Sequence, residues 1–367
     1  MEKQERLGSL DALRGFDMFF IIGGAALVKA LFGLFPSSLS DFVIGQMYHV
    51  DWHGFTFYDM IFPLFLFIAG VSFPYSLASS RNKCLSETKI IFTIFKRGFK
   101  LVLFGFIFNE ILKLDFENMR YASVLGRIGI AWMIAALIYM HVNVKWSVII
   151  SMSILIGYNL INVFLINPNA PAGTSPLSIE GSVVAWFDLN YLPGKTLLPT
   201  HDPLGILSTF PAIVTAILGM LTGTFLKNDA RIEHKKVLMI LLSSVFLIVA
   251  GLFWNLFFPI NKMLWSSSYV VFAGGLSLLL LTLFYYVIDV LKFKKWSFFF
   301  TVIGLNSITV YMAQKIINFK QISVFLGAGT VKHFPEVYQP LVSSIVYLAV
   351  IWGFLYFLYR NKIFLKV

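Results

Sequence analysis

Long apolar stretches recur along the chain and constrain its fold more than any other feature. A helix needs about 20 mostly apolar residues to cross the roughly 30 Å hydrocarbon core of a bilayer. Only 13% of the residues are charged, about half the usual fraction in a globular protein. The sequence therefore predicts an all-α, polytopic membrane helical bundle of about 10–11 transmembrane helices and excludes a soluble enzyme. The expected spans are 15–35, 60–79, 91–111, 123–142, 147–166, 205–226, 237–258, 267–288, 297–315 and 340–359, with 321–330 too short to cross.

The basic residues predict the orientation of this bundle. Most of the 29 Lys and Arg residues fall in segments that are inside if the N-terminus is cytoplasmic, so the positive-inside rule places both termini in the cytoplasm. The net charge of +11 is then a property of inner loops and does not indicate nucleic acid binding. No linker divides the chain, so we expect one domain over 1–367 with an outer loop at 167–204. The apolar patch at 183–187 indicates that this loop is ordered.

Charged residues near the first span form one group of interest, because a charge at membrane depth is costly and usually faces a partner or a cavity. Asp11, Arg14 and Asp17 are three residues apart and can share one face of a helix. The pattern fits a structural ladder of ion pairs. It also fits an entry site for an anionic ligand from the cytoplasm, with the Arg14 guanidinium binding phosphate.

A second group of polar residues precedes the second span. His49, Asp51, His53 and Asp59 lie within eleven residues. The two histidines have i, i+4 spacing, but no third ligand is evident, so we predict no metal. Solvated interfacial histidines and a helix-capping Asp59 are structural alternatives. The catalytic alternative uses one imidazole as a general base and a carboxylate that orients it.

Polar side chains near the later spans complete the candidate set. Arg127 lies about one turn inside the fourth span and needs a carboxylate, for which Asp59 is the expected partner. Asp202 precedes the sixth span, where it could cap the helix. Asn306 lies within the ninth span, where amides usually bond another helix. The segment before the eighth span contains Asn261, Lys262, Trp265 and Tyr269, and its two aromatic residues fit an interfacial belt.

These segments together resemble one family. The motifs, in chain order, are 9–15 (SLDALRG), 49–54 (HVDWHG) leading into 59–63 (DMIFP), 124–129 (VLGRIG), 202–209 (DPLGILST), and 261–266 (NKMLWS) with 304–307 (GLNS). They are similar to the motifs of the heparan-α-glucosaminide N-acetyltransferase family, in its bacterial branch, and extend over most of the chain from residue 7 to about 315. One such motif alone is weak, but five in order are specific.

The resemblance implies a multi-span acetyltransferase of the bacterial inner membrane, working as a homodimer. Such an enzyme takes an acetyl group from cytoplasmic acetyl-CoA and delivers it to the amine of a glucosamine-type amino sugar or glycan end on the periplasmic side. The active-site histidine of the family falls on His49, its span-two aspartate on Asp59 and its buried arginine on Arg127.

The predicted topology suits this transfer, because acetyl-CoA is too anionic to cross a bilayer. We expect the nucleotide end to be held at the inner mouth by Asp11, Arg14, Arg97 and Lys100. We expect His49 to deprotonate the acceptor, Asp59 and Arg127 to fix the imidazole and its local potential, and Asn306 to donate to the oxyanion. The residues expected to contact the acceptor are Asp51, Trp52, His53, Asp202, Asn261, Lys262, Trp265 and Tyr269. The alternative is a transporter for sugars or organic acids, which would move its substrate unmodified and without acetyl-CoA.

Overall fold

The regular structure of the chain is helical throughout the part that is described, which confirms the predicted all-α class. The structure is a computed structural model that describes residues 7–228 and 232–365. Among these residues the extended pairing is confined to two isolated bridges, Arg120 with Gly194 and Ile166 with Ser182.

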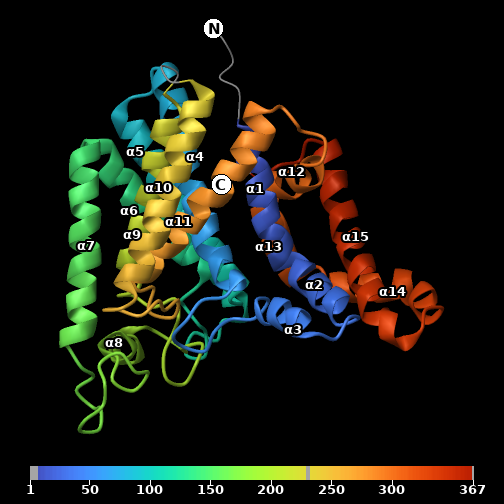
Figure 1. Ribbon diagram of the computed structural model, residues 1–367, viewed down its shortest axis with the longest axis horizontal. Coiled ribbons are helices and arrows are strands. Elements are labelled where there is room, and N and C mark those ends of the chain that lie inside the picture. Colours follow the sequence, from blue (N-terminus) through green and yellow to red (C-terminus); the bar gives the residue numbers. More distant parts are fainter. Residues whose placement is uncertain (1–6, 229–231, 366–367) are drawn as a thin grey trace. The chain divides into compact units, whose positions relative to one another are not determined.

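The α-helices are α1 (Gly8–Phe19), α2 (Ala25–Phe32), α3 (Ser38–Gly45), α4 (Ile61–Asn82), α5 (Glu87–Phe108), α6 (Val124–His141), α7 (Val144–Phe164), α8 (Val183–Tyr191), α9 (Thr209–Leu226), α10 (Glu233–Trp254), α11 (Ser267–Phe284), α12 (Phe298–Leu305), α13 (Ser307–Ile316), α14 (Phe319–Lys332) and α15 (Gln339–Arg360) (Figure 1). Shorter 3₁₀ or π turns are η1 (Phe20–Gly24), η2 (Phe57–Met60), η3 (Ile111–Lys113), η4 (Tyr285–Val290) and η5 (Glu336–Tyr338).

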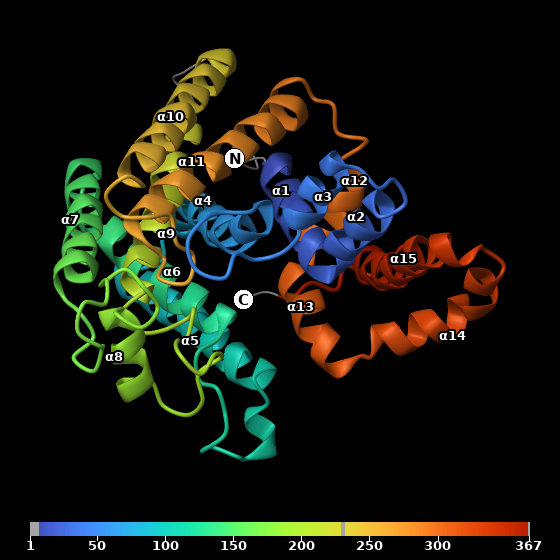
Figure 2. The same cartoon turned by 60° about the horizontal axis from the view of Figure 1, so that its bottom comes forward.

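The described residues form two compact units. The first contains 7–50, 56–61 and 280–365, and the second contains 51–55, 62–228 and 232–279. In the first unit α14 leaves the end of α13 and returns alongside α15, as Figure 2 shows. In the second unit α9 packs against both α6 and α7. That the whole chain acts as a single domain stays a prediction.

Eight helical segments of the described chain are long and apolar enough to cross a membrane. They are Gly8–Phe32, Phe57–Asn82, Val124–His141, Val144–Phe164, Thr209–Leu226, Glu233–Trp254, Ser267–Val290 and Glu336–Arg360. This result confirms a multi-pass membrane protein built as a helical bundle.

Two of the ten expected spans have a different form. The stretch 91–108 of the expected span 91–111 belongs to α5, a 22-residue helix whose middle carries Lys96, Arg97 and Lys100, and these charges keep it out of the set of eight. The stretch 297–315 is not one span, because the chain leaves the helical conformation at Asn306 (φ −123°, ψ 28°) between α12 and α13. The Asn306 side chain accepts a local hydrogen bond from the Thr309 hydroxyl, the kind of contact that competes with helix continuation.

Glycine at a close helix crossing fixes the position of α1. A Cβ atom added to Gly15 would lie 1.7 Å from the Phe300 carbonyl oxygen, and one added to Gly304 would lie 1.9 Å from the Asp11 carbonyl oxygen. Small residues of this kind let helix backbones approach closely inside a membrane. The crossing holds α1, which carries the first group of charged residues, directly against α12.

A break in the first span packs against the segment that precedes α4. Gly23 has φ of +143° inside η1, where the helix widens to a π turn. Phe20 from this turn packs with Met47 and Ile61, and the rings of Phe57 and Tyr58 cover the same cluster. Widened helical turns of this type occur often next to functional sites.

Candidate functional site

A histidine–aspartate pair lies at the entry to α4 in the first unit. His49 Nδ1 is 2.8 Å from Asp59 Oδ1. The Asp59 side chain is fully buried, whereas the imidazole remains 45% exposed. The ring of Tyr58 lies against the imidazole, with 4.8 Å between ring centroids. The sequence placed these residues in one motif, and the fold brings His49 and Asp59 into direct contact.

A capping box holds the carboxylate of this pair. Asp59 Oδ2 accepts a hydrogen bond from the Thr56 backbone N–H at 3.1 Å, and the Thr56 hydroxyl lies 3.0 Å from the same oxygen. Asp59 therefore has a capping role, as the structural alternative predicted, and orients the imidazole with its other oxygen. A carboxylate fixed on both oxygens cannot rotate away from the histidine.

The geometry determines what the imidazole can do chemically. Because the Asp59 carboxylate accepts from Nδ1–H, Nε2 is the nitrogen that carries the lone pair. A carboxylate in this position also stabilises the imidazolium that forms when Nε2 takes a proton. The pair therefore has the arrangement of an oriented general base with a half-exposed ring.

Asp11, Arg14 and Asp17 are the residues of the first unit that were expected to form a series of ion pairs. Arg14 Nη1 is 3.4 Å from Asp11 Oδ1, which confirms that these two side chains share a helix face. Asp17 is fully buried, and neither of its carboxylate oxygens has a hydrogen-bond partner within the described residues. Asn306 is 2% exposed and its Nδ2 likewise has no acceptor there. Among residues 7–228 and 232–365, the amide NH₂ therefore does not make the interhelical bond that its position suggested.

Arg127 belongs to the second unit, where it has its own partners. Its Nη2 donates to the Gly205 carbonyl oxygen at 3.2 Å and to the Ser208 hydroxyl. The guanidinium also lies over the Trp265 ring, 5.1 Å from the centroid. Because Asp59 is part of the first unit, the pairing of Arg127 with Asp59 stays a prediction.

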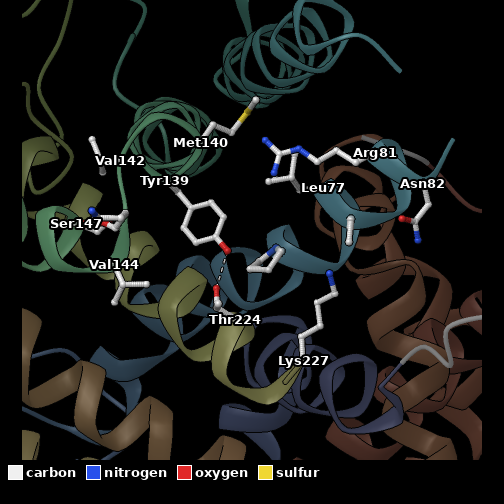
Figure 3. Close-up of a pocket in the computed structure, with 13 residues that line it drawn as sticks. Leu77, Arg81, Asn82, Tyr139, Met140, Val142, Val144, Ser147, Thr224 and Lys227 are labelled. Atoms are coloured by element: carbon white, nitrogen blue, oxygen red, sulfur yellow. Dashed lines mark hydrogen bonds between the residues drawn. The ribbon is translucent and has the colours of Figure 1, made fainter. Parts of the chain in front are cut away.

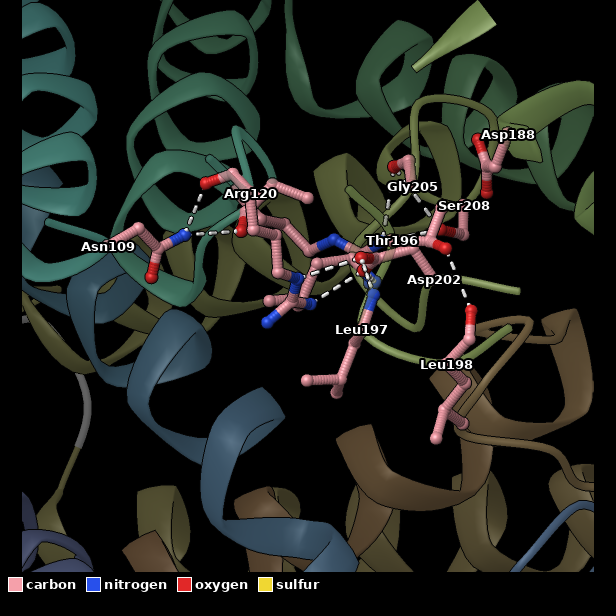
Figure 4. Close-up of polar contacts among 12 residues, drawn as sticks. Asn109, Arg120, Asp188, Thr196, Leu197, Leu198, Asp202, Gly205 and Ser208 are labelled. Atoms are coloured by element: carbon pink, nitrogen blue, oxygen red, sulfur yellow. Dashed lines mark hydrogen bonds and ion pairs between the residues drawn. The ribbon is translucent and has the colours of Figure 1, made fainter. Parts of the chain in front are cut away.

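An ion pair that sequence analysis did not anticipate joins two segments of the second unit. Arg120 and Asp202 form a bidentate contact, with Nε–Oδ2 at 2.7 Å and Nη2–Oδ1 at 2.6 Å (Figure 4). Asp202 also accepts hydrogen bonds from the backbone N–H groups of Leu197 and Leu204. Asp202 therefore does not cap a helix, since α9 begins at Thr209.

The remaining predicted acceptor contacts of the second unit form a packed aromatic and amide cluster. Trp52, 9% exposed, donates from its indole N–H to the Leu177 carbonyl oxygen at 2.8 Å and packs with Val184 of α8. This contact packs the 167–204 loop against the segment that precedes the second span. Asn261 is fully buried, and its Nδ2 lies 3.3 Å from His53 Nδ1.

The exposure of the other predicted acceptor residues varies. Trp265 and Tyr269 are fully buried with rings 5.2 Å apart, so they are core residues of the bundle rather than a lipid-facing belt. Asp51 is exposed and Lys262 is half-buried. Burial lowers the pKa of His53, while its backbone hydrogen bond at Leu177 opposes that shift. His53 is therefore held toward the neutral imidazole. Binding of an acceptor by any of these residues stays a prediction.

Asp188 of α8 is a titratable group that the sequence did not single out. Its Oδ1 accepts the Ile206 N–H at 2.8 Å, and a Cβ atom on Gly205 would lie 1.6 Å from Oδ2. Burial raises the pKa of Asp188 to about 6, against the lowering effects of the Ile206 hydrogen bond and of Arg127. The sequence around Asp188 does not indicate this role, because its contact with Ile206 depends on how the loop folds back on the start of α9.

This pKa predicts a pH dependence of stability. The folded protein keeps the Asp188 proton between pH 3.8 and about 6, a range in which the unfolded chain has lost it. The free energy of unfolding should therefore fall as pH rises through that window, by about 2–3 kcal/mol. Asp188→Asn should remove this slope, and thermal unfolding of both proteins in detergent from pH 4 to 7 measures it. An unchanged slope in the variant would assign the effect to another group.

Two of the basic residues expected to bind the nucleotide end, Arg97 and Lys100, lie on α5. Arg97 of α5 stacks over the Trp132 ring at 4.2 Å, and Lys100 of the same helix is half-buried. A separate cavity of about 550 Å³ lies between the ends of α4, α6, α7 and α9 (Figure 3). Arg81 and Lys227 line it, and Arg81 is also paired with Glu87 at 3.0 Å. The structure places neither Arg97 nor Lys100 in this cavity.

The helices and their polar contacts define a polytopic membrane protein with a histidine–carboxylate pair just before the N-terminal end of α4. No protein-family model matches the chain. The chain is 26% identical over 419 aligned residues to the heparan-alpha-glucosaminide N-acetyltransferase of Mus musculus, which covers all of this chain and 62% of that protein. It is 28% identical over 373 residues to the Homo sapiens protein of the same name, with 87% of this chain and 55% of that protein covered.

The chain is thus similar over most of its length to heparan-alpha-glucosaminide N-acetyltransferases. The chain spans less than two thirds of the length of these curated relatives. Among the described residues, no group of three or more His, Cys, Asp or Glu side chains could hold a metal ion.

Proposed function

We propose that this chain is a membrane acetyltransferase that moves an acetyl group from acetyl-CoA to the amine of a glucosamine-type sugar. The His49–Asp59 pair is the observation that carries the proposal. A half-exposed imidazole held through Nδ1 by a fully buried carboxylate is suited to remove a proton from an attacking amine. The relatives are named as N-acetyltransferases of heparan-alpha-glucosaminide, which supports an amino sugar as the acceptor.

The proposed reaction needs one base and one leaving group. The acceptor nitrogen attacks the thioester carbonyl carbon, and a new N–C bond forms as the carbonyl electrons move to oxygen. Nε2 of His49 takes the N–H proton. The oxyanion then re-forms the C=O bond as the C–S bond breaks, the electron pair of that bond leaves with the sulfur of CoA, and the histidine returns the proton to the thiolate. The buried Asp59 carboxylate stabilises the imidazolium between these two steps.

Two further residues have supporting roles in this proposal. The amide Nδ2 of Asn306, buried without an acceptor among the described residues, is a candidate donor to the carbonyl oxygen as it becomes negative. Arg14, in the middle of α1, is a candidate for binding the phosphates of acetyl-CoA. The donor would enter from the cytoplasm and the product would leave on the periplasmic side of a bacterial inner membrane, with the enzyme acting as a homodimer.

Reconstitution of the purified full chain in liposomes tests the proposal. With acetyl-labelled acetyl-CoA on one side and glucosamine on the other, we expect one molecule of CoA released for each molecule of N-acetylated sugar. Glucose, which lacks the amine, is the matched control and should stay unlabelled. A transporter would instead move unmodified glucosamine without acetyl-CoA, and that result would overturn the proposal.

A further inference from the structure

A second cavity of the second unit lies between α5, α6 and α9 and has a volume of about 360 Å³. Leu192, Pro193 and residues 204–206 also line it. The cavity is lined mostly by apolar side chains. It therefore fits a hydrocarbon group better than a sugar or a nucleotide.

The polar and apolar residues of this cavity are separated along its length. Ser123, Arg127 and Thr209 line it at the first turns of α6 and α9. Ile130 and Ile134 line it farther along α6, and seven helical residues beyond Arg127 correspond to about 10 Å. The cavity is thus amphipathic, with a polar end where the helices begin and an apolar end toward the middle of the span.

The cation at the polar end has unused donors. Arg127 is 3% exposed, and its Nε and Nη1 have no hydrogen-bond partner within the described residues. Asp188 and Asp202 attract this cation electrostatically, but their hydrogen bonds go to other groups, since Asp202 binds Arg120 and Asp188 accepts from Ile206. A buried guanidinium in a membrane normally has acceptors for its N–H groups, so the site lacks an acceptor group that a ligand can supply.

We propose that this cavity binds one acyl chain of an anionic phospholipid, whose phosphodiester accepts hydrogen bonds from Arg127. A water molecule occupies about 30 Å³ of liquid, so the cavity has room for about a dozen groups of that size. This volume matches one acyl chain and not two. Ile130, Ile206 and Phe210 on the rim are 39%, 40% and 51% exposed. Such an apolar rim on a membrane helix bundle lets a lipid enter sideways from the bilayer.

Binding would also stabilise the segment that Arg127 holds. The guanidinium already donates to Gly205 and Ser208 at the start of α9, so a phosphate that fixes the guanidinium also fixes this turn. The inference does not depend on the acetyltransferase proposal, because neither His49 nor Asp59 takes part in it.

Native mass spectrometry of the purified full chain tests the inference. The protein is titrated with phosphatidylglycerol and with phosphatidylcholine of the same acyl chains. We expect at least tenfold tighter binding of phosphatidylglycerol, and a raised unfolding midpoint in its presence. Arg127→Gln should lower that affinity to the level of phosphatidylcholine. Ile134→Trp, which fills the apolar end and leaves the guanidinium intact, should weaken binding of phosphatidylglycerol by a similar factor.

Lys227→Gln is the matched control, because this cation lines the other cavity of the same unit and should not change lipid binding. Ile134→Trp keeps the inference testable even if Arg127→Gln fails to fold. Wild-type affinity for phosphatidylglycerol in Ile134→Trp would overturn the inference. So would equal binding of the two phospholipids to the unmodified protein, or binding of oleate without binding of phosphatidylglycerol.

Discussion

His49→Ala should lower acetyl transfer by about 100- to 10,000-fold, the usual contribution of a positioned general base. The substitution removes an imidazole that is 45% exposed and leaves Asp59 fixed by Thr56, so η2 keeps its capping box. The rate of CoA release in proteoliposomes that contain acetyl-CoA and glucosamine measures the effect. Circular dichroism and the unfolding midpoint establish that the variant retains its fold.

His333→Ala is the matched control for this experiment. His333 is an exposed histidine of the same unit, and its Nδ1 lies 2.6 Å from the carbonyl oxygen of Gly329, one turn earlier. Its loss should leave the rate unchanged. Asp59→Asn should lower the rate as well, because an amide can present its NH₂ to Nδ1 and so favour the wrong tautomer. Acetyl transfer that persists at the wild-type rate in His49→Ala would exclude the proposed base.

The parts of the fold that could be predicted depend on local sequence. Hydrophobic stretches of about 20 residues predicted the spans, and spacing of three residues predicted that Asp11 and Arg14 share a helix face. His49 and Asp59 could be expected together because ten residues separate them in one motif. In each case the signal and the contact lie within the same short segment.

Contacts between distant segments could not be predicted in this way. The partner of Arg120 lies 82 residues away, and no periodicity connects the two. Asp188 reaches Ile206 only because the loop folds back on the start of α9. The break at Asn306 could not be predicted for a different reason. The stretch 297–315 is apolar enough to cross a bilayer, and hydropathy does not detect a single residue that leaves the helical conformation.

Arg120→Gln should destabilise the protein by about 3–5 kcal/mol, the usual cost of removing one partner of a buried ion pair. The Asp202 side chain is fully buried and the Arg120 side chain is only 20% exposed, so the variant leaves a carboxylate with two backbone donors and no cation. Arg81→Gln is the matched control, because the Arg81–Glu87 pair has side chains 50% and 57% exposed. Its loss should cost no more than about 1 kcal/mol.

A double-mutant cycle separates the ion pair from other effects of these substitutions. In Arg120→Gln combined with Asp202→Asn, neither member of the pair remains as an uncompensated buried charge, so the double variant should be more stable than the sum of the two single losses predicts. The free energy of unfolding in mixed micelles gives all four corners of the cycle. Additive losses would mean that Arg120 and Asp202 stabilise the loop independently, for example through the Leu197 and Leu204 hydrogen bonds alone.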